Sequence, residues 1–159
     1  MNFFASIRSL RVAPDSTAAT TWTLAAGTTD VNSAAIDTQG FRGVAFLPIF
    51  GDNADTATFT GKIQGSTDGS TGWTDITGAT FSFTAGASDT DNELTGVEVY
   101  SPLFRYVRFV SDRGVANTVL AALLTFLYDP TIEVIDQTTS SPATGTLGFI
   151  TAPVTVSTV

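Results

Sequence analysis

The chain has 159 residues, of which 43% are hydrophobic, enough for one domain with a packed core but not comfortably for two. Its net charge of −8 argues against a protein that coats nucleic acid, because such proteins neutralise phosphates with lysine and arginine. The sequence contains no cysteine and no histidine, which excludes disulfides, thiolate chemistry, Cys/His zinc sites and a Ser–His–Asp triad.

The first 18 residues are predicted to form an irregular N-terminal arm with apolar anchors at Phe3, Phe4, Ile7 and Leu10. The stretch lacks the apolar core of a secretory signal, so we expect synthesis without export. No apolar run approaches the roughly 20 residues that a membrane helix needs, so no membrane partner is expected.

Short segments follow, separated by turns rich in Gly, Asp, Ser and Thr; most alternate apolar and polar residues, whereas 40–50 is apolar on both faces. They predict strands at 20–26, 31–36, 40–50, 56–66, 73–76, 79–84, 95–100, 104–111 and 117–128. Pro48 lacks an N–H group, so it marks an edge, a bend or a bulge. With no convincing helix, the pattern predicts an all-β fold, an antiparallel β-sandwich or jelly roll.

The segment 117–128 (NTVLAALLTFLY) is apolar on both of its sides. Alternation puts Val119, Ala121, Leu123, Thr125 and Leu127 on one side, and Leu120, Ala122, Leu124, Phe126 and Tyr128 on the other. A strand with one solvated face should alternate apolar and polar residues, and this one does not. A buried helix is the alternative, disfavoured by the short run between a turn and Asp129-Pro130. We expect the domain core to cover one face, and a terminal arm or a neighbouring subunit the other.

The last segment, 131–159, has no lysine or arginine and many Thr, Ser and Pro residues. One interpretation is a disordered tail. The alternations Ile132/Val134 and Val154/Val156, and the apolar pair Phe149–Ile150, favour an extended C-terminal arm that adds a strand to a neighbour's sheet. The chain is thus divided into an N-terminal arm (1–18), a β-sandwich domain (19–130) and an extended C-terminal arm (131–159).

Catalytic and cofactor chemistry is not expected. Carboxylates alone can support an enzyme, but the aspartates of this chain lie mostly in turns, where they are usually solvated. The acidic loop 89–93 (DTDNE) offers oxygens that suit Ca²⁺, yet it lacks the spacing of an EF-hand, so a solvated turn is favoured. We therefore predict no enzymatic activity, no cofactor and no metal.

Three side chains have more than one interpretation. Trp73 either fills the core beneath its turn, the favoured interpretation, or stacks on a sugar. Arg105 and Arg108 fall on opposite faces of a regular strand, so one of them emerges at a rim, pairs with a carboxylate or meets a partner.

Three stretches carry a family resemblance: 63–76 (IQGSTDGSTGWTDI), 104–110 (FRYVRFV) and the apolar strand that ends in Tyr128-Asp129-Pro130. In this order, within residues 40–130, they resemble the capsid decoration, or cement, proteins of tailed bacteriophages, which have jelly-roll-like folds. The resemblance implies trimers or other oligomers on the outside of a capsid, with arms that reach adjacent subunits.

The same stretches also resemble discoidin-type, galactose-binding-like domains, in which an S-x-DG-x-x-W turn and an R-Y-V-R strand recur; here the turn reads STDGSTGW, one residue longer than that pattern. This resemblance implies a carbohydrate-binding module, which would use Trp73 and the loops near Asp52 and Asp89. The chain departs from that family in its N-terminal region and in its two terminal arms.

We therefore expect a viral structural protein on the capsid exterior, assembled in the host cytoplasm, that stabilises contacts between capsomers. The expected partners are the major capsid protein and further copies of the chain, as a homo-trimer or another homo-oligomer, without nucleic acid or membrane. The alternatives are a carbohydrate-binding module and another virion component of neck or tail. The residues expected to bind partners lie in the arms: Phe3, Phe4, Ile7, Ile132, Val134, Phe149, Ile150, Val154 and Val156.

Overall fold

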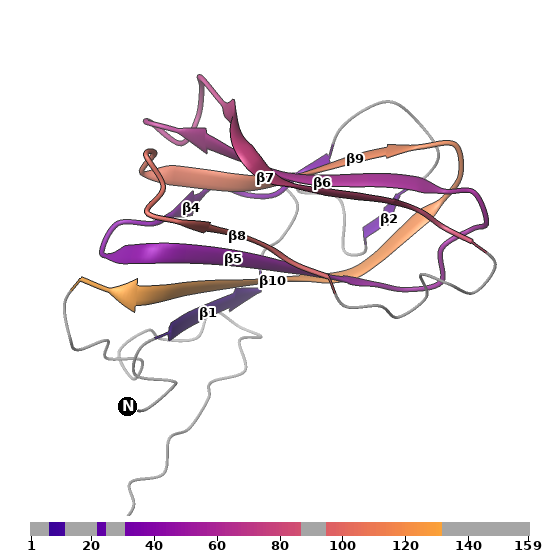
Figure 1. Ribbon diagram of the computed structural model, residues 1–159, viewed down its shortest axis with the longest axis horizontal. Helices are drawn as coiled ribbons and strands as arrows, with labels where there is room; N and C mark the ends of the chain where they lie inside the picture. Colours follow the sequence, from indigo (N-terminus) through magenta and orange to yellow (C-terminus); the bar gives the residue numbers. More distant parts are fainter. Residues whose placement is uncertain (1–6, 12–21, 25–30, 87–94, 132–159) are drawn as a thin grey trace, which may run out of the picture.

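The computed structural model describes residues 7–11, 22–24, 31–86 and 95–131 of the chain (Figure 1). All regular secondary structure within these residues is β-strand. They are β1 (Ile7–Arg11), β2 (Trp22–Leu24), β3 (Val31–Asn32), β4 (Ile36–Asp37), β5 (Phe41–Phe50), β6 (Thr58–Ser66), β7 (Thr74–Thr84), β8 (Val97–Tyr100), β9 (Tyr106–Gly114) and β10 (Thr118–Pro130).

The strands form two antiparallel sheets that pack face to face (Figure 1). One sheet has the order β1-β10-β5-β8, with β2 also paired to β10; the other has the order β3-β9-β6-β7, with β4 also paired to β9. Apart from the consecutive pair β6–β7, neighbouring strands in both sheets are distant in sequence, as in a jelly roll. The predicted all-β sandwich is confirmed.

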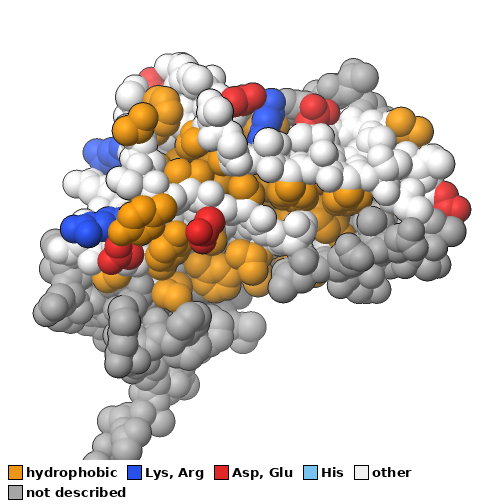
Figure 2. All heavy atoms as spheres, viewed as in Figure 1, with side chains coloured by type: hydrophobic (Ala, Val, Ile, Leu, Met, Phe, Trp, Pro, Cys, Tyr) orange, Lys and Arg blue, Asp and Glu red, His pale blue; other side chains and the backbone are white. Residues whose placement is uncertain are grey.

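The core lies between the sheets and is rich in phenylalanine. Phe59 on β6 is 1% exposed, and its ring lies 4.9 Å from that of Phe50 and 5.5 Å from that of Phe83, measured between centroids. The alternation predicted for β6 and β7 is confirmed, because Phe59 and Ile63 are buried while Phe81 and Phe83 pack against the core. At the edge where β7 and β8 face each other, apolar side chains show between the two layers (Figure 2).

The segment predicted at 117–128 forms strand β10, but its side chains do not alternate regularly between the two faces of the sheet. Its pairing with β5 shifts register between Leu120 and Ala122, so a β-bulge adds one residue. Leu120 consequently shares the core face with Leu123 and Leu127, all at most 1% exposed, and Val119 lies on the outer face. The prediction that put Val119 with Leu123 was wrong, since one extra residue reverses every side chain before it.

Several strand boundaries also differ from the sequence prediction. The segments 73–76 and 79–84 belong to one strand, β7, whose pairing shifts register opposite Lys62 and Gln64. The segment 31–36 is divided into β3 and β4. Within the predicted N-terminal arm, Ile7–Arg11 forms β1, which pairs with β10.

The turn between β9 and β10 comes later than Asp112–Gly114, where the sequence predicted it. Gly114 still pairs with Thr58 of β6, so β9 runs through this glycine. Val115 then makes the turn with φ 65°, a value that β-branched residues rarely adopt, and its side chain is 71% exposed. Extended pairing with β6 therefore decides where the strand ends, against the local preference of the glycine.

Proline at position 48 fits the predicted edge or bulge. Among the described residues β8 pairs with β5 only from Gly43 to Phe46, so β5 has a neighbour on one side at Pro48. On that side β10 opposes it with Leu123, close to the bulge. The missing N–H group therefore lies where the sheet has an edge.

Candidate functional site

The outer face of the β1-β10-β5-β8 sheet is apolar at its centre. We name this surface the outer β10 face and define it by seven half-buried side chains: Ala45, Leu47 and Ile49 of β5, and Val119, Ala122, Leu124 and Phe126 of β10. The register places Leu124 opposite Leu47, Phe126 opposite Ala45, and Ala122 opposite Ile49, so these residues form one continuous surface.

The other sheet has an outer face of the opposite character. Its residues on β6 and β7 are hydroxyl-bearing, amide or charged, namely Thr58, Thr60, Lys62, Gln64, Thr80, Ser82 and Thr84. This is the usual composition of a solvated sheet face. The contrast between the two sheets of one sandwich singles out the outer β10 face as a candidate contact surface, because contiguous exposed apolar patches mark interaction sites.

Two tyrosines border the outer β10 face at the β8 edge. The rings of Tyr100 and Tyr128 lie 6.3 Å apart between centroids, and Tyr128 lies over Gly43, where a Cβ would come within 2.1 Å of it. The Tyr100 hydroxyl donates to Asp129 at 2.6 Å, and the Tyr128 hydroxyl donates to Glu98 at 3.3 Å. Burial and the neighbouring Glu98 carboxylate raise the pKa of Tyr128 above its usual value. The border is thus amphipathic, with polar tips on apolar rings.

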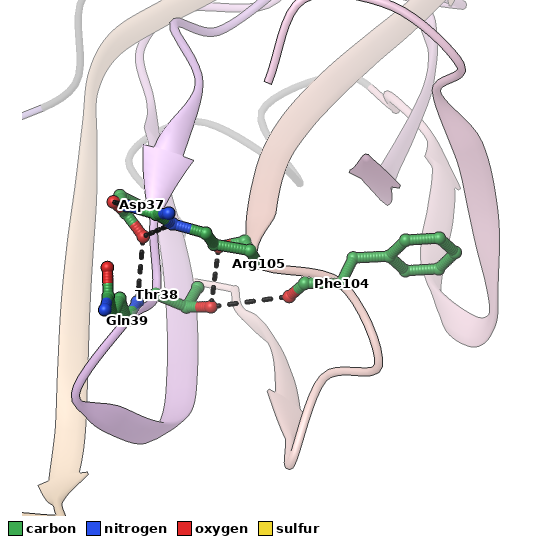
Figure 3. Close-up of polar contacts among 5 residues, drawn as sticks. All are labelled: Asp37, Thr38, Gln39, Phe104 and Arg105. Atoms are coloured by element: carbon green, nitrogen blue, oxygen red, sulfur yellow. Dashed lines mark hydrogen bonds and ion pairs between the residues drawn. The ribbon is translucent and has the colours of Figure 1, made fainter. Parts of the chain in front are cut away.

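The loop between β8 and β9 presents Leu103, which is 96% exposed. Thr38 holds the loop, because its N–H and its hydroxyl donate to the Arg105 carbonyl at 2.9 and 2.8 Å (Figure 3). On its other side, Phe104 packs over Gly65, where a Cβ would lie only 2.1 Å from the ring. An exposed leucine on an anchored loop is a second candidate contact point, which the sequence reasoning missed.

Arg105 pairs with the Asp37 carboxylate, which is one of the outcomes expected for the two arginines. Its Nη2 donates to Asp37 Oδ2 at 2.8 Å and its Nε to Asp37 Oδ1 at 3.1 Å (Figure 3). The Arg105 hydrogen bonds hold the pKa of Asp37 below its usual value. The side chains are 51% and 40% exposed, so the pair adds little stability and serves mainly to fix the loop.

Trp73 borders a shallow groove on the outer side of the other sheet. The groove has a volume of about 320 Å³ and is lined by Ser33, Ala35, Gly69, Ser70, Trp73 and Arg108. The Arg108 guanidinium lies 4.3 Å from the centroid of the Trp73 ring and donates to Gln64 Oε1 at 2.7 and 2.9 Å. Trp73 is half-buried beside this arginine and not in the hydrophobic core cluster, where the favoured interpretation had placed it.

The turn before the groove is organised by Asp68. Its carboxylate accepts the hydroxyl of Thr71 at 2.6 Å and the backbone N–H groups of Thr71 and Ser70 at 2.7 and 2.8 Å. These bonds, that of the Thr71 hydroxyl first, hold the pKa of Asp68 far below its usual value. The predicted Asp68-Gly69 turn is present, with Gly69 at φ 76°.

We predict that Asp68→Asn flattens the acid limb of the stability profile. A carboxyl group whose pKa is depressed by folding stabilises the protein above its unfolded pKa, about 3.9, and loses that effect as the pH falls toward the folded value. Wild-type protein should therefore lose stability below about pH 4 more steeply than the variant. Urea midpoints measured between pH 7 and pH 2.5 check this, with the exposed Asp55→Asn as control, and parallel curves would contradict it.

The predicted partner-binding residues are only partly visible. Ile7 lies on β1, opposite Tyr128 in the domain's own sheet. The remaining arm residues and the acidic loop 89–93 lie outside the described residues: Phe3, Phe4, Ile132, Val134, Phe149, Ile150, Val154 and Val156. Leu47 and Ile49 join the candidate surface, and the two-sided apolar run at 40–50 was the signal for them.

The described residues include no candidate for a membrane-spanning helix. The same residues contain no group of three or more acidic side chains placed to hold a metal ion.

Comparison with known proteins identifies a similar fold. No protein-family model matches the chain, and no curated protein matches it. The fold is similar to that in the crystal structure of the PBSX exported protein XepA, with a TM-score of 0.51 and 16% sequence identity. The match covers 92% of this chain and 44% of that protein, so the chain spans less than half of its length. At this identity the likeness establishes the sandwich fold.

Proposed function

We propose that the protein is a structural component of a tailed-bacteriophage virion, a decoration or cement protein that binds the outer surface of the capsid and bridges neighbouring capsomers. The observation that carries the proposal is the outer β10 face, an apolar surface at the centre of a sheet whose sandwich partner has a polar one. A lone sandwich needs no such face, whereas a subunit of an assembly does.

The physical basis of binding is burial of this face against a capsid subunit or a further copy of the chain. Each Å² of apolar surface removed from water contributes about 25 cal/mol, so side chains such as Leu124 and Phe126 provide a sizeable driving force. Repetition of the contact over a symmetric shell adds avidity. Leu103 is placed to supply an additional anchor at the β8–β9 loop.

The terminal arms extend the same proposal. Their apolar residues, such as Phe3 and Phe149, would bind adjacent subunits by burial and by strand addition to exposed sheet edges. The ordering of an arm costs conformational entropy, which several buried side chains can offset.

The charge of the chain fits a position on the capsid exterior. A net charge of −8 repels packaged DNA, so nucleic acid is not among the proposed partners, and no membrane partner is proposed. The proposed role is structural and not enzymatic, and it requires no cofactor. Two findings add support: the resemblance of 63–76, 104–110 and 128–130 to decoration proteins, and the fold shared with the PBSX exported protein XepA.

The test is cosedimentation of the purified full chain with empty capsid shells of the phage that encodes it, prepared without the chain. We expect saturable binding to the shells and a homo-oligomer in solution. A monomer that stays in the supernatant at every shell concentration would overturn the proposal.

A second candidate function, carbohydrate binding, is favoured by the groove beside Trp73. Tryptophan rings stack on sugars, and the groove adds the exposed Ser70 at its wall. Arg108 already lies over the Trp73 ring, however, so a sugar would have to share that side chain or displace the arginine.

A glycan array with Trp73→Ala as control distinguishes the two functions. The virion proposal predicts that the Trp73→Ala substitution abolishes binding to no glycan on the array. A monomer whose glycan binding is lost in the variant would favour the carbohydrate-binding function instead.

A further inference from the structure

The segment Thr80-Phe81-Ser82-Phe83-Thr84 of β7 reads the same in both directions. It lies in the regular part of the strand, where Thr80, Ser82 and Thr84 pair with Lys62, Thr60 and Thr58 of β6 in unbroken register. A palindromic strand is complementary to a second copy of itself in antiparallel pairing, because residue i meets residue j and residue j meets residue i about a two-fold axis.

Strand β7 is an edge strand. In the part of the chain that the structure describes, it pairs only with β6. Natural proteins protect such edges with charges, prolines or bulges, since an open edge is a template for another strand. From Thr80 to Thr84 the edge has none of these protections: the register shift lies before Thr80, and the segment TFSFT is uncharged.

In the palindrome, the backbone N–H and C=O groups of alternate residues face away from β6, as pairing with a second copy requires. Ala85 donates its N–H to the Ala57 carbonyl at 2.7 Å and accepts the Thr56 N–H at 2.8 Å, so its groups face the β6 side. Because successive residues of a strand face opposite edges, the N–H and carbonyl groups of Thr84, Ser82 and Thr80 face away from β6. Ser82 is thus placed to exchange two hydrogen bonds with Ser82 of a second copy.

The side chains fit the same pairing. Phe81 and Phe83 face inward, and Phe81 crosses Gly61, where a Cβ would come within 2.4 Å of its ring. In a two-fold pair Phe81 would lie beside Phe83 of the other copy, and the two cores would continue into each other at the edge where apolar side chains show (Figure 2). Aromatic and threonine cross-strand pairs stabilise such contacts.

We propose that two copies of the chain associate through β7, paired antiparallel about a two-fold axis at Ser82, to form one continuous sheet. This inference deepens the self-association in the proposed function and rests on it. The pairing leaves the outer β10 face open, because that face belongs to the other sheet. The dimer can therefore form in solution and still bind a capsid.

The chain contains no cysteine, so a single Ser82→Cys substitution gives a clean test by cross-linking. In a hydrogen-bonded antiparallel pair the two Cα atoms lie about 5.5 Å apart, within the range that a disulfide spans. Under mild oxidation we expect most of the full-length Ser82→Cys protein to become a covalent dimer. Thr77→Cys, exposed on the same strand outside the palindrome, should stay largely uncross-linked.

Ser82→Lys gives the equilibrium measurement. Two lysines directly opposite each other repel, so analytical ultracentrifugation should show the dimer dissociation constant raised about tenfold or more, with Thr77→Lys close to wild type. An oligomer that responds equally to both substitutions, or equal cross-linking of both cysteine variants, would overturn the β7 interface and leave the proposed function intact. A monomeric wild-type chain would refute both this inference and the self-association on which it rests. Binding to the shells is measured independently, by the cosedimentation described above.

Discussion

Replacement of Phe59 by alanine is expected to lower the free energy of unfolding by about 3–5 kcal/mol. The side chain is 1% exposed and lies among the rings of Phe50, Phe81, Phe83 and Phe109, at centroid distances of 4.9, 5.9, 5.5 and 6.5 Å. Its removal leaves a cavity between two sheets that cannot close independently, so the transfer and cavity costs add. The total free energy of unfolding of a small domain is about 5–15 kcal/mol, so the variant should be largely unfolded in moderate urea.

Equilibrium urea unfolding followed by circular dichroism measures this loss. Thr60→Ala is the matched control, because it removes a half-buried side chain from the next position of β6 on the solvated face. The control should change stability by no more than about 0.5–1 kcal/mol. A loss below about 1 kcal/mol for Phe59→Ala, with an unchanged denaturant slope, would contradict the central place of this ring in the core.

Leu124→Lys is expected to weaken binding to empty capsid shells at least about thirtyfold, the equivalent of one interface hot spot of about 2 kcal/mol. Leu124 lies in the middle of the outer β10 face, opposite Leu47, and is half-buried in the free chain. A lysine there can extend along the sheet with its ammonium group in water, so the isolated domain should stay folded. Against a partner surface, the same ammonium group would be buried without a counter-charge.

Quantitative cosedimentation or surface plasmon resonance on immobilised shells gives the affinity. Thr60→Lys makes the same charge change on the outer face of the other sheet and should bind like wild type. Thermal unfolding of both variants checks that the fold is intact. Equal affinities for the two lysine variants would mean that the shell does not bind the outer β10 face.

The strands and the two-sided apolar run were predictable because alternation is a local property. The run at 117–128 identified Leu124 and Phe126 as members of a second apolar face, and both lie on it. The bulge near Ala121 was not predictable, since a period of two carries no information about where one extra residue enters. Val119 and Leu120 therefore exchanged faces relative to the prediction.

Features that depend on strand order could not be read from the sequence. Trp73, Arg108 and Gln64 come together because β9 pairs with β6 so that Arg108 lies opposite Gln64, a register set by long-range contacts. The palindrome around Ser82 is visible in the sequence, but it acquires meaning only because β7 is an edge strand. The turn at Val115 likewise follows from the pairing of Gly114 with β6 and not from the residues of the turn.

The most direct test of the central claim is a cryo-electron microscopy map of capsids that carry the protein, at a resolution that separates the two sheets. The proposed function predicts that the sheet containing Leu124 and Leu47 faces the capsid or an adjacent subunit, with the threonine-rich face of β6 and β7 toward solvent. A map in which the outer β10 face points into solvent, or in which the capsids carry no copies of the chain, would contradict the proposal.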